Sequence, residues 1–97
     1  MKECSSLEEL RTQIDALDDQ IVDMIAERNR YVRQAAKFKN SVDEIKADER
    51  IDAVINRVRH RALTAGLSPN MITELYRMMI DEMVEAEIAE FRNTNTF

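Results

Sequence analysis

Apolar residues recur along the N-terminal part of the chain with the spacing of one face of an α-helix. No Gly or Pro interrupts this stretch, and Ser6 followed by Glu9 has the form of a capping box. The pattern predicts one helix from about Leu7 to Lys39, roughly 50 Å long at about 1.5 Å per residue. Its apolar face carries Leu7, Leu10, Ile14, Leu17, Ile21, Met24, Tyr31, Ala35 and Phe38.

A second helix is expected after a break in this period. The stretch from Asn40 to Lys46 loses the period, so we expect a loop there. The next helix should begin near Asp48 and end at Gly66, because glycine readily adopts the left-handed conformation that follows many helices. One face of this helix is apolar and carries Ile51, Val54, Ile55, Val58 and Ala62.

The third predicted helix begins at Ser68 and Pro69, an N-cap residue followed by proline at the first helical position. It should run to about Arg92, and the tail from Asn93 to Phe97 is expected to fray. The residues expected to point inward include Met71, Ile72, Leu75, Met79, Met83 and Ala86.

The composition supports an all-α fold with three helices per chain. One Gly and one Pro provide almost no turn chemistry for β-hairpins. A length of 97 residues allows a single domain, residues 1–97. Because the later helices are too short to cover the long first one, we predict an intertwined homodimer. The alternative is a monomer in which the first helix breaks near Arg28.

The formal net charge of −5 argues against nucleic acid and anionic membranes as partners. The single cysteine, Cys4, excludes an intrachain disulfide and fits a reducing compartment. The N-terminal residues lack the apolar core of a secretion signal, and no apolar run is long enough for a membrane span. We therefore expect a cytoplasmic protein.

Two cations interrupt the apolar face of the first predicted helix. Arg28 stands between Met24 and Tyr31, and Lys39 follows eleven residues later, about 16 Å along the same face. Arginine grips carboxylates in a bidentate manner, so the pair suggests a site for one small dianion. The alternative is structural: a nearby glutamate satisfies Arg28, and the end of the helix favours Lys39.

Arg11 lies about 42 Å from Lys39 along this helix, too far to share one small ligand within a chain. In an antiparallel dimer, Arg11 of one chain reaches the Arg28 and Lys39 site of the other. The alternative is an ordinary surface arginine.

Glu87 stands on a largely apolar row of the third predicted helix, near Met83, Val84 and Phe91. Such surroundings disfavour a carboxylate, so Glu87 is a candidate to hold a proton near neutrality and donate a hydrogen bond. The alternative is that it pairs with Arg28 or Lys39 and satisfies that cation.

The sequence gives little indication of functional residues beyond these four. His60 lies in a basic run, residues 57–61, without a Cys or His at ligand spacing, and we interpret it as a solvated residue. The methionines at 78, 79 and 83 are interpreted as core. No metal motif, Gly-rich phosphate loop or nucleophile with its base is present, so we predict no cofactor and no metal.

Four segments resemble the all-helical class of chorismate mutases, and within it the isochorismate-pyruvate lyase branch. They are Leu10-Arg11-Thr12-Gln13-Ile14-Asp15, Asp18-Asp19-Gln20-Ile21-Val22, Ala26-Glu27-Arg28-Asn29-Arg30 and Ala36-Lys37-Phe38-Lys39. The likeness extends from about Cys4 to Arg92.

This resemblance implies an intertwined helical dimer with two sites, each built from both chains. Arg11 of the partner chain and Arg28 of this chain would bind the two carboxylates of a chorismate-like substrate. Lys39 would contact the ether oxygen of the breaking bond and a carboxylate, and Glu87 would bond the same oxygen from the other side. Arg50 matches a further basic position. The reaction needs no cofactor, because binding orients the substrate and donors stabilise charge on the ether oxygen.

Two departures leave the reaction open. Mutases of the class commonly carry acids near the start of the second helix, where this chain has Ala47 and Ile51, as in the lyase branch. Conversely, the lyase has Gln where this chain has Glu87, and Glu occurs there in some mutases. We expect a chorismate mutase forming prephenate, with isochorismate-pyruvate lyase as the alternative and a non-catalytic dimerisation module as a third reading.

Overall fold

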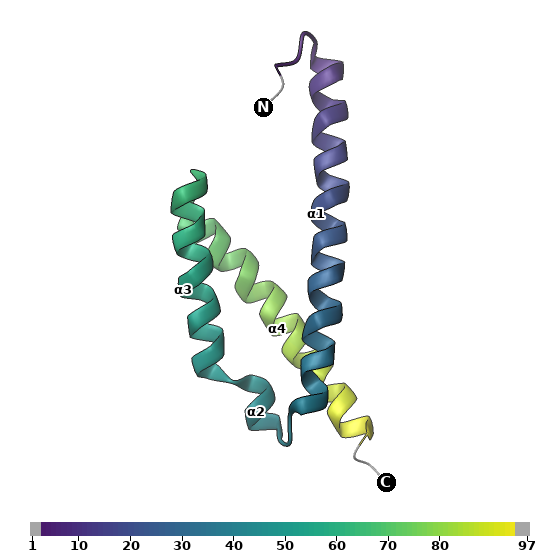
Figure 1. Ribbon diagram of the computed structural model, residues 1–97, viewed down its shortest axis with the longest axis vertical. Helices are drawn as coiled ribbons and strands as arrows, with labels where there is room; N and C mark the ends of the chain where they lie inside the picture. The colour runs from purple at the N-terminus through teal and green to yellow at the C-terminus, as the bar shows by residue number, and fades with distance from the viewer. Residues whose placement is uncertain (1–2, 95–97) are drawn as a thin grey trace. The chain divides into compact units, whose positions relative to one another are not determined.

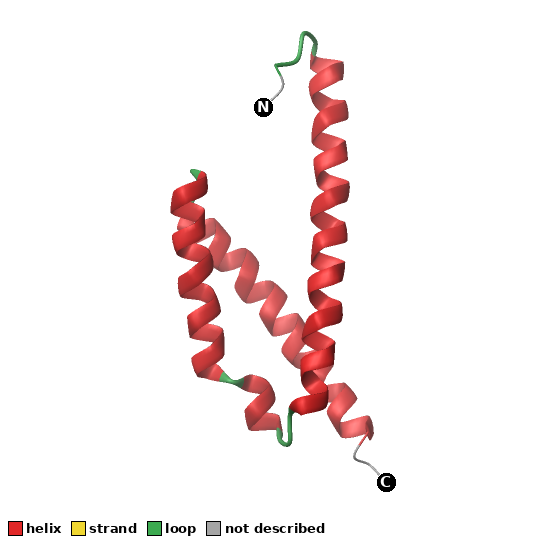
Figure 2. Ribbon diagram, in the orientation of Figure 1, coloured by secondary structure: helices red, strands yellow, loops and turns green. Residues whose placement is uncertain are grey.

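The computed structural model describes residues 3–94, and every regular element in that range is helical (Figure 1 and Figure 2). The elements are helix α1 (Leu7–Ala35), a 3-10 turn η1 (Ala36–Phe38), and helices α2 (Val42–Lys46), α3 (Asp48–Ala65) and α4 (Pro69–Thr94). The prediction of an all-α fold with three long helices, the first the longest, is confirmed. The chain divides into two units, and the boundary between Val32 and Arg33 falls within α1.

Helix α1 begins as the capping box predicted. The Ser6 hydroxyl accepts a hydrogen bond from the Glu9 backbone N–H at 3.1 Å. The Glu9 carboxylate reaches back one residue further than expected, and accepts from the Ser5 N–H at 3.2 Å and the Ser5 hydroxyl at 2.9 Å. These bonds satisfy backbone donors that have no partner inside the helix.

The apolar face of α1 is exposed within the chain. No residue of the helix is buried. The exposed fraction is 56% for Leu17, which contrasts with 4% for Ile55 in α3. The other exposed large apolar residues of the predicted face are Leu7, Leu10, Ile14, Ile21, Met24 and Tyr31.

The C-terminal end of α1 differs from the prediction. The α-helix ends at Ala35 rather than Lys39, and the next three residues tighten into the 3-10 turn, closed by a Lys39 N–H to Ala36 C=O bond of 3.1 Å. Lys39 itself is extended, with φ −97° and ψ 137°. A helix without a capping glycine commonly ends through such a turn, which satisfies some of its last carbonyls.

The loop predicted from Asn40 to Lys46 is wrong, because most of this stretch forms α2. Ser41 caps the helix, and its hydroxyl accepts from the Glu44 N–H at 3.2 Å. The Glu44 carboxylate in turn accepts from the Asn40 N–H. Ser41 and Glu44 therefore form a capping box with the same spacing as Ser6 and Glu9, a signal present in the sequence.

Helix α3 begins and ends where predicted. Ala47 links α2 to α3 in the left-handed conformation, with φ 34°. At the other end Gly66 has φ 76°, and Leu67 donates to the Ala62 carbonyl at 2.8 Å, closing a Schellman-type end. The predicted face is confirmed: Val54, Ile55, Val58 and Ala62 are buried, and Ile51 packs against them.

Helix α4 packs against α3 and α2, and α3 with α4 forms the core of the second unit (Figure 1). Ile80 joins the buried cluster of α3, and Met83 is also buried. The inward prediction is right for Met83 and in part for Ile72 and Met79, which are half-buried. It is wrong for Met71, Leu75 and Ala86, which are exposed.

The row of α4 that meets α3 is rotated from the predicted one. Ile72, Tyr76, Ile80 and Val84 contact the α3 cluster. Arg59 of α3 fixes the start of α4, since its Nη1 donates to the Thr73 hydroxyl at 2.6 Å and to the Pro69 carbonyl at 3.3 Å. The predicted end near Arg92 is extended to Thr94, and the remaining three residues of the predicted frayed tail lie outside the described residues.

Candidate active site

Lys39 stands at the end of the 3-10 turn, where the chain leaves helical geometry. The residue is half-buried. Its ammonium Nζ donates a hydrogen bond to the backbone carbonyl of Glu44 at 3.1 Å. Because α2 is capped by Ser41, the carbonyl that receives this bond has a fixed place. The short helix therefore orients the lysine.

Glu87 is the buried charged residue of the described chain. Its side chain on α4 is only 4% exposed. Its Oε2 atom is buried and forms no hydrogen bond within residues 3–94. A buried carboxyl oxygen without such a bond is costly in a finished core, so this atom is suited to meet a ligand.

The pKa of Glu87 is raised above its usual value. Removal of the carboxylate from water is the main cause, and Glu90 adds to it by repulsion. The nearby Lys39 ammonium acts in the opposite direction but does not cancel the effect. Glu87 therefore keeps its proton to higher pH than an ordinary glutamate, and in that form its hydroxyl donates a hydrogen bond.

The structure brings Lys39 and Glu87 close enough to interact electrostatically. Lys39 and Glu87 are 48 positions apart in the sequence, and both lie in the second unit. When Glu87 holds its proton, the pair offers two donors for one oxygen atom that gains negative charge. The predicted roles of the two residues at the ether oxygen stay predictions.

The other two predicted site residues lie in the first unit. Arg28 is half-buried, whereas Arg11 is exposed near the start of α1. Seventeen residues of continuous helix separate them by about 25 Å at about 1.5 Å per residue. One chain therefore does not bring both to one small ligand.

Arg28 and Lys39 do not lie on one face of a continuous α-helix, so this prediction is wrong. It assumed an unbroken α-helix through both residues, but α1 ends at Ala35 and Lys39 is extended. Helical periodicity thus does not relate these two side chains. Their joint role in binding one ligand now rests on the family resemblance alone and stays a prediction.

Residues near the start of α3 have mixed positions. Arg50, the supporting basic residue, is exposed in the first turn. Ala47 forms the hinge between α2 and α3, and Ile51 packs against the core of α3 and α4. Neither of these two supplies a polar group from its side chain.

The roles of Glu44 and Glu90 were not predicted, although Glu90 is the one polar residue among the helical neighbours of Glu87. Glu44 holds Lys39 through its backbone carbonyl, and the capping box with Ser41 was the signal that identifies its helix. Glu90 raises the pKa of Glu87 from one turn further along α4, a relation that i, i+3 spacing predicts.

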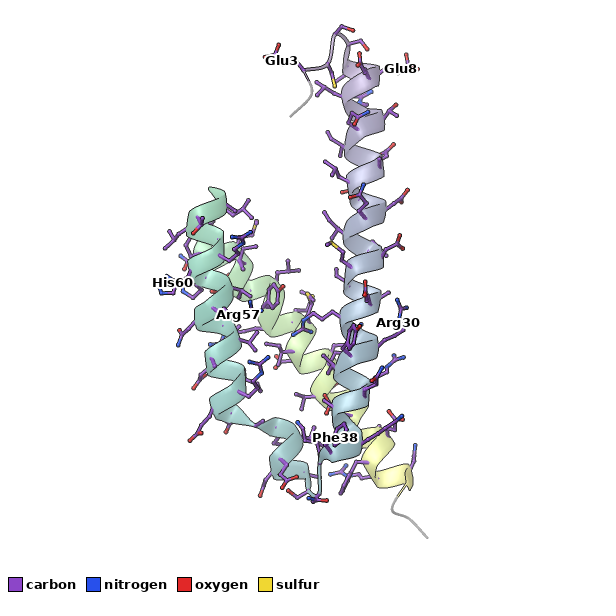
Figure 3. The ribbon with its side chains drawn as sticks, in the orientation of Figure 1. Glu3, Glu8, Arg30, Phe38, Arg57 and His60 are labelled. Atoms are coloured by element: carbon purple, nitrogen blue, oxygen red, sulfur yellow. The ribbon has the colours of Figure 1, made fainter. Side chains whose placement is uncertain are left out.

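The weaker candidates from the sequence, His60 and its basic run, do not form a site in the described residues. His60 is exposed on α3, and its side chain and that of Arg57 extend away from the helix (Figure 3). Within residues 3–94 no group of three or more His, Cys, Asp or Glu side chains is arranged to hold a metal ion. In the same range no helix combines the length and the apolar character that crossing a bilayer requires.

Comparison with known proteins gives one family. Residues 10–88 match the family model described as chorismate mutase type II. The isochorismate pyruvate lyase of Pseudomonas aeruginosa is 30% identical over 93 residues, which cover 96% of this chain and 92% of that protein. The chorismate mutase of Methanocaldococcus jannaschii is 29% identical over 76 residues, 77% of each chain. The T-protein of Haemophilus influenzae is 33% identical over 78 residues, 79% of this chain but 21% of that protein.

Proposed function

Because this chain belongs to the chorismate mutase type II family, we propose that it is a chorismate mutase that converts chorismate to prephenate. The observation that carries the proposal is the pair of Lys39 and Glu87. A buried carboxyl with a raised pKa beside an ammonium suits an oxygen that becomes negative during the reaction, because its protonated form donates a hydrogen bond.

In this rearrangement the ether C–O bond breaks while a C–C bond forms between the enolpyruvyl arm and the ring. Electrons move in one cycle, so no group of the protein has to be a nucleophile. Negative charge develops on the ether oxygen, and we assign Lys39 and Glu87 as its two hydrogen-bond donors. The protein also holds the arm over the ring, which removes orientational entropy before the bonds change.

The carboxylates of the substrate are assigned to two arginines. Arg28 would bind one carboxylate, and Arg11 of a second chain would bind the other, since the guanidinium fork matches a carboxylate. The separation of about 25 Å between Arg11 and Arg28 along α1 supports a contribution from a partner. Each site would then contain residues of both chains.

The proposed assembly is an intertwined homodimer. The exposed apolar face of α1 supports it, because a helix about 44 Å long with this many exposed leucines and isoleucines is unlike the surface of a monomer. A second copy of the same face is the partner with matching pattern and symmetry. The cytoplasm is the proposed compartment, supported by the lone Cys4.

A second candidate reaction is the cleavage of isochorismate to salicylate and pyruvate. Two observations favour it: a relative that covers 96% of this chain bears that activity in its name, and Ala47 and Ile51 replace acids expected of a mutase. The same donors would act on the same kind of ether oxygen.

A product assay separates these readings. The purified protein is given chorismate and isochorismate in separate reactions, and the products are identified by chromatography. Prephenate from chorismate, with little salicylate from isochorismate, supports the mutase. Salicylate and pyruvate as main products identify the lyase, and no turnover of either substrate across acidic and neutral pH contradicts both.

A further inference from the structure

A cavity, termed the outer cavity, is lined in part by Lys39 but not by Glu87. It has a volume of about 310 Å³, and it is lined by residues of the last turn of α1, the 3-10 turn and the end of α4. All of its lining residues lie in the second unit, and Glu87 is not among them. Ala36 and Lys37 of the 3-10 turn are among its lining residues, and their neighbour Phe38 is labelled in Figure 3.

The lining of this outer cavity is cationic in an acidic chain. Arg33, Lys37 and Lys39 contribute three positive charges, and Glu90 contributes one negative charge. The formal charge of the whole chain is −5. The side chains of Arg33 and Lys37 are exposed, so they are accessible to a dissolved anion. The local excess of positive charge favours a carboxylate or a similar small anion.

The remaining wall selects among anions. Phe91 offers an aromatic ring, Ala36 is small and apolar, and Asn40 adds an amide. A cavity of 310 Å³ lies at the small end of the range of about 300–1,000 Å³ for ligand pockets. Aromatic rings pack favourably against each other, which favours a flat ring over a flexible chain.

We propose that the outer cavity binds a small aromatic carboxylate, with its carboxylate on Arg33 and Lys37 and its ring on Phe91. Lys39 belongs both to this cavity and to the pair with Glu87. An anion in the cavity attracts the Lys39 ammonium away from the reacting oxygen. The occupant therefore lowers turnover without occupying the place of the substrate, an effect that rests on the proposed function.

Binding is tested with benzoate as the probe, followed by NMR of the backbone amides. We expect shifts at residues 33–40 and 90–91, and weaker binding of benzamide, which lacks the charge, and of cyclohexanecarboxylate, which lacks the aromatic ring. Arg33→Ala should weaken benzoate binding roughly tenfold, as loss of a hydrogen bond between charged groups does. Arg61→Ala, which removes an exposed arginine of α3, should leave it unchanged.

Shifts that map elsewhere, or equal affinity in the Arg33→Ala and Arg61→Ala variants, would overturn the proposal. This binding experiment is independent of turnover, so it decides the point even if chorismate is not converted. With an active enzyme, benzoate should lower kcat, and Arg33→Ala should relieve this inhibition. Purely competitive inhibition that Arg33→Ala does not change would overturn the regulatory effect.

Discussion

Helix α1 and the pair of helices α3 and α4 differ in how far their apolar faces are buried within the chain. All three have an apolar face, yet α3 buries Val54, Ile55, Val58 and Ala62, and α1 buries nothing within the chain. The core of α3 and α4 is built from one chain, and Glu87 of α4 is itself buried. The face of α1 stays exposed within the chain, and a second copy of it is the proposed partner. The two regions therefore differ: Lys39 and Glu87 interact within one chain, whereas the proposed roles of Arg11 and Arg28 depend on the proposed partner.

The largest effect is expected from a charge placed on the open face of α1. Leu17→Glu would bury a carboxylate at the proposed interface, at a cost of several kcal/mol in each of two copies. We expect the dimer dissociation constant to rise roughly 1,000-fold or more, with loss of activity. Light scattering coupled to gel filtration measures the mass.

The matched control is Ala16→Glu, which adds the same charge to an exposed neighbour away from the apolar face. It should leave mass and activity unchanged. If Leu17→Glu also keeps the wild-type mass at micromolar concentration, the apolar face of α1 is not a dimer interface.

A smaller effect is expected when a buried side chain of the α3 and α4 core is truncated. Ile55→Ala removes a side chain that is 4% exposed in the α3 and α4 core, and should lower the free energy of unfolding by about 2–5 kcal/mol. The dimer should persist. Urea denaturation checks the loss, with the exposed neighbour Asn56→Ala as a control that changes stability by less than about 0.5 kcal/mol. A near-neutral Ile55→Ala would show that α3 and α4 do not form the core described.

Glu87 is a buried charged residue of α4, and the smallest expected effect concerns its titration. Because burial raises its pKa, the protonated donor is present at low pH and is lost as pH rises through the raised pKa. Activity should fall over the same range. Glu87→Gln donates a hydrogen bond at every pH, so its activity should be flat where the wild type declines.

Stability should follow the same sign. The unfolded glutamate titrates near 4.5, so stability is greatest below that pH and decreases as pH rises to the raised pKa of the folded state. Glu87→Gln should remove this decrease, whereas Glu85→Gln, at an exposed position of α4, should not. A wild-type activity and stability that stay constant from mildly acidic to alkaline pH would contradict the protonated donor.

Much of the fold was predictable because local signals agree with it. Ser6 with Glu9, Gly66, and Ser68 with Pro69 mark helix ends by chemistry that acts within a few residues. The errors arose where a signal was overlooked or depends on packing. The capping box of Ser41 and Glu44 was readable and predicts α2. The rotation of α4 is set by contacts with α3, which helical periodicity alone does not determine.

The candidate site was predictable only in part. Glu87 was identified from its apolar neighbours, and its burial and raised pKa agree with that reasoning. The link between Lys39 and Glu87 depends on tertiary structure, and the early end of α1 removed the helical argument that placed Lys39 with Arg28. The roles of Arg11 and Arg28 remain predictions, because they require a second chain.

A subunit-mixing experiment tests the shared site most directly. Arg11→Ala and Lys39→Ala are prepared separately, and each should lose activity by about 100- to 1,000-fold, as loss of a key donor does. The two variants are then unfolded, mixed in equal amounts and refolded together. If each site takes Arg11 from one chain and Lys39 from the other, half of the dimers are mixed and each has one intact site. We predict recovery of about a quarter of wild-type activity; a mixture no more active than its parents would contradict a site built from two chains.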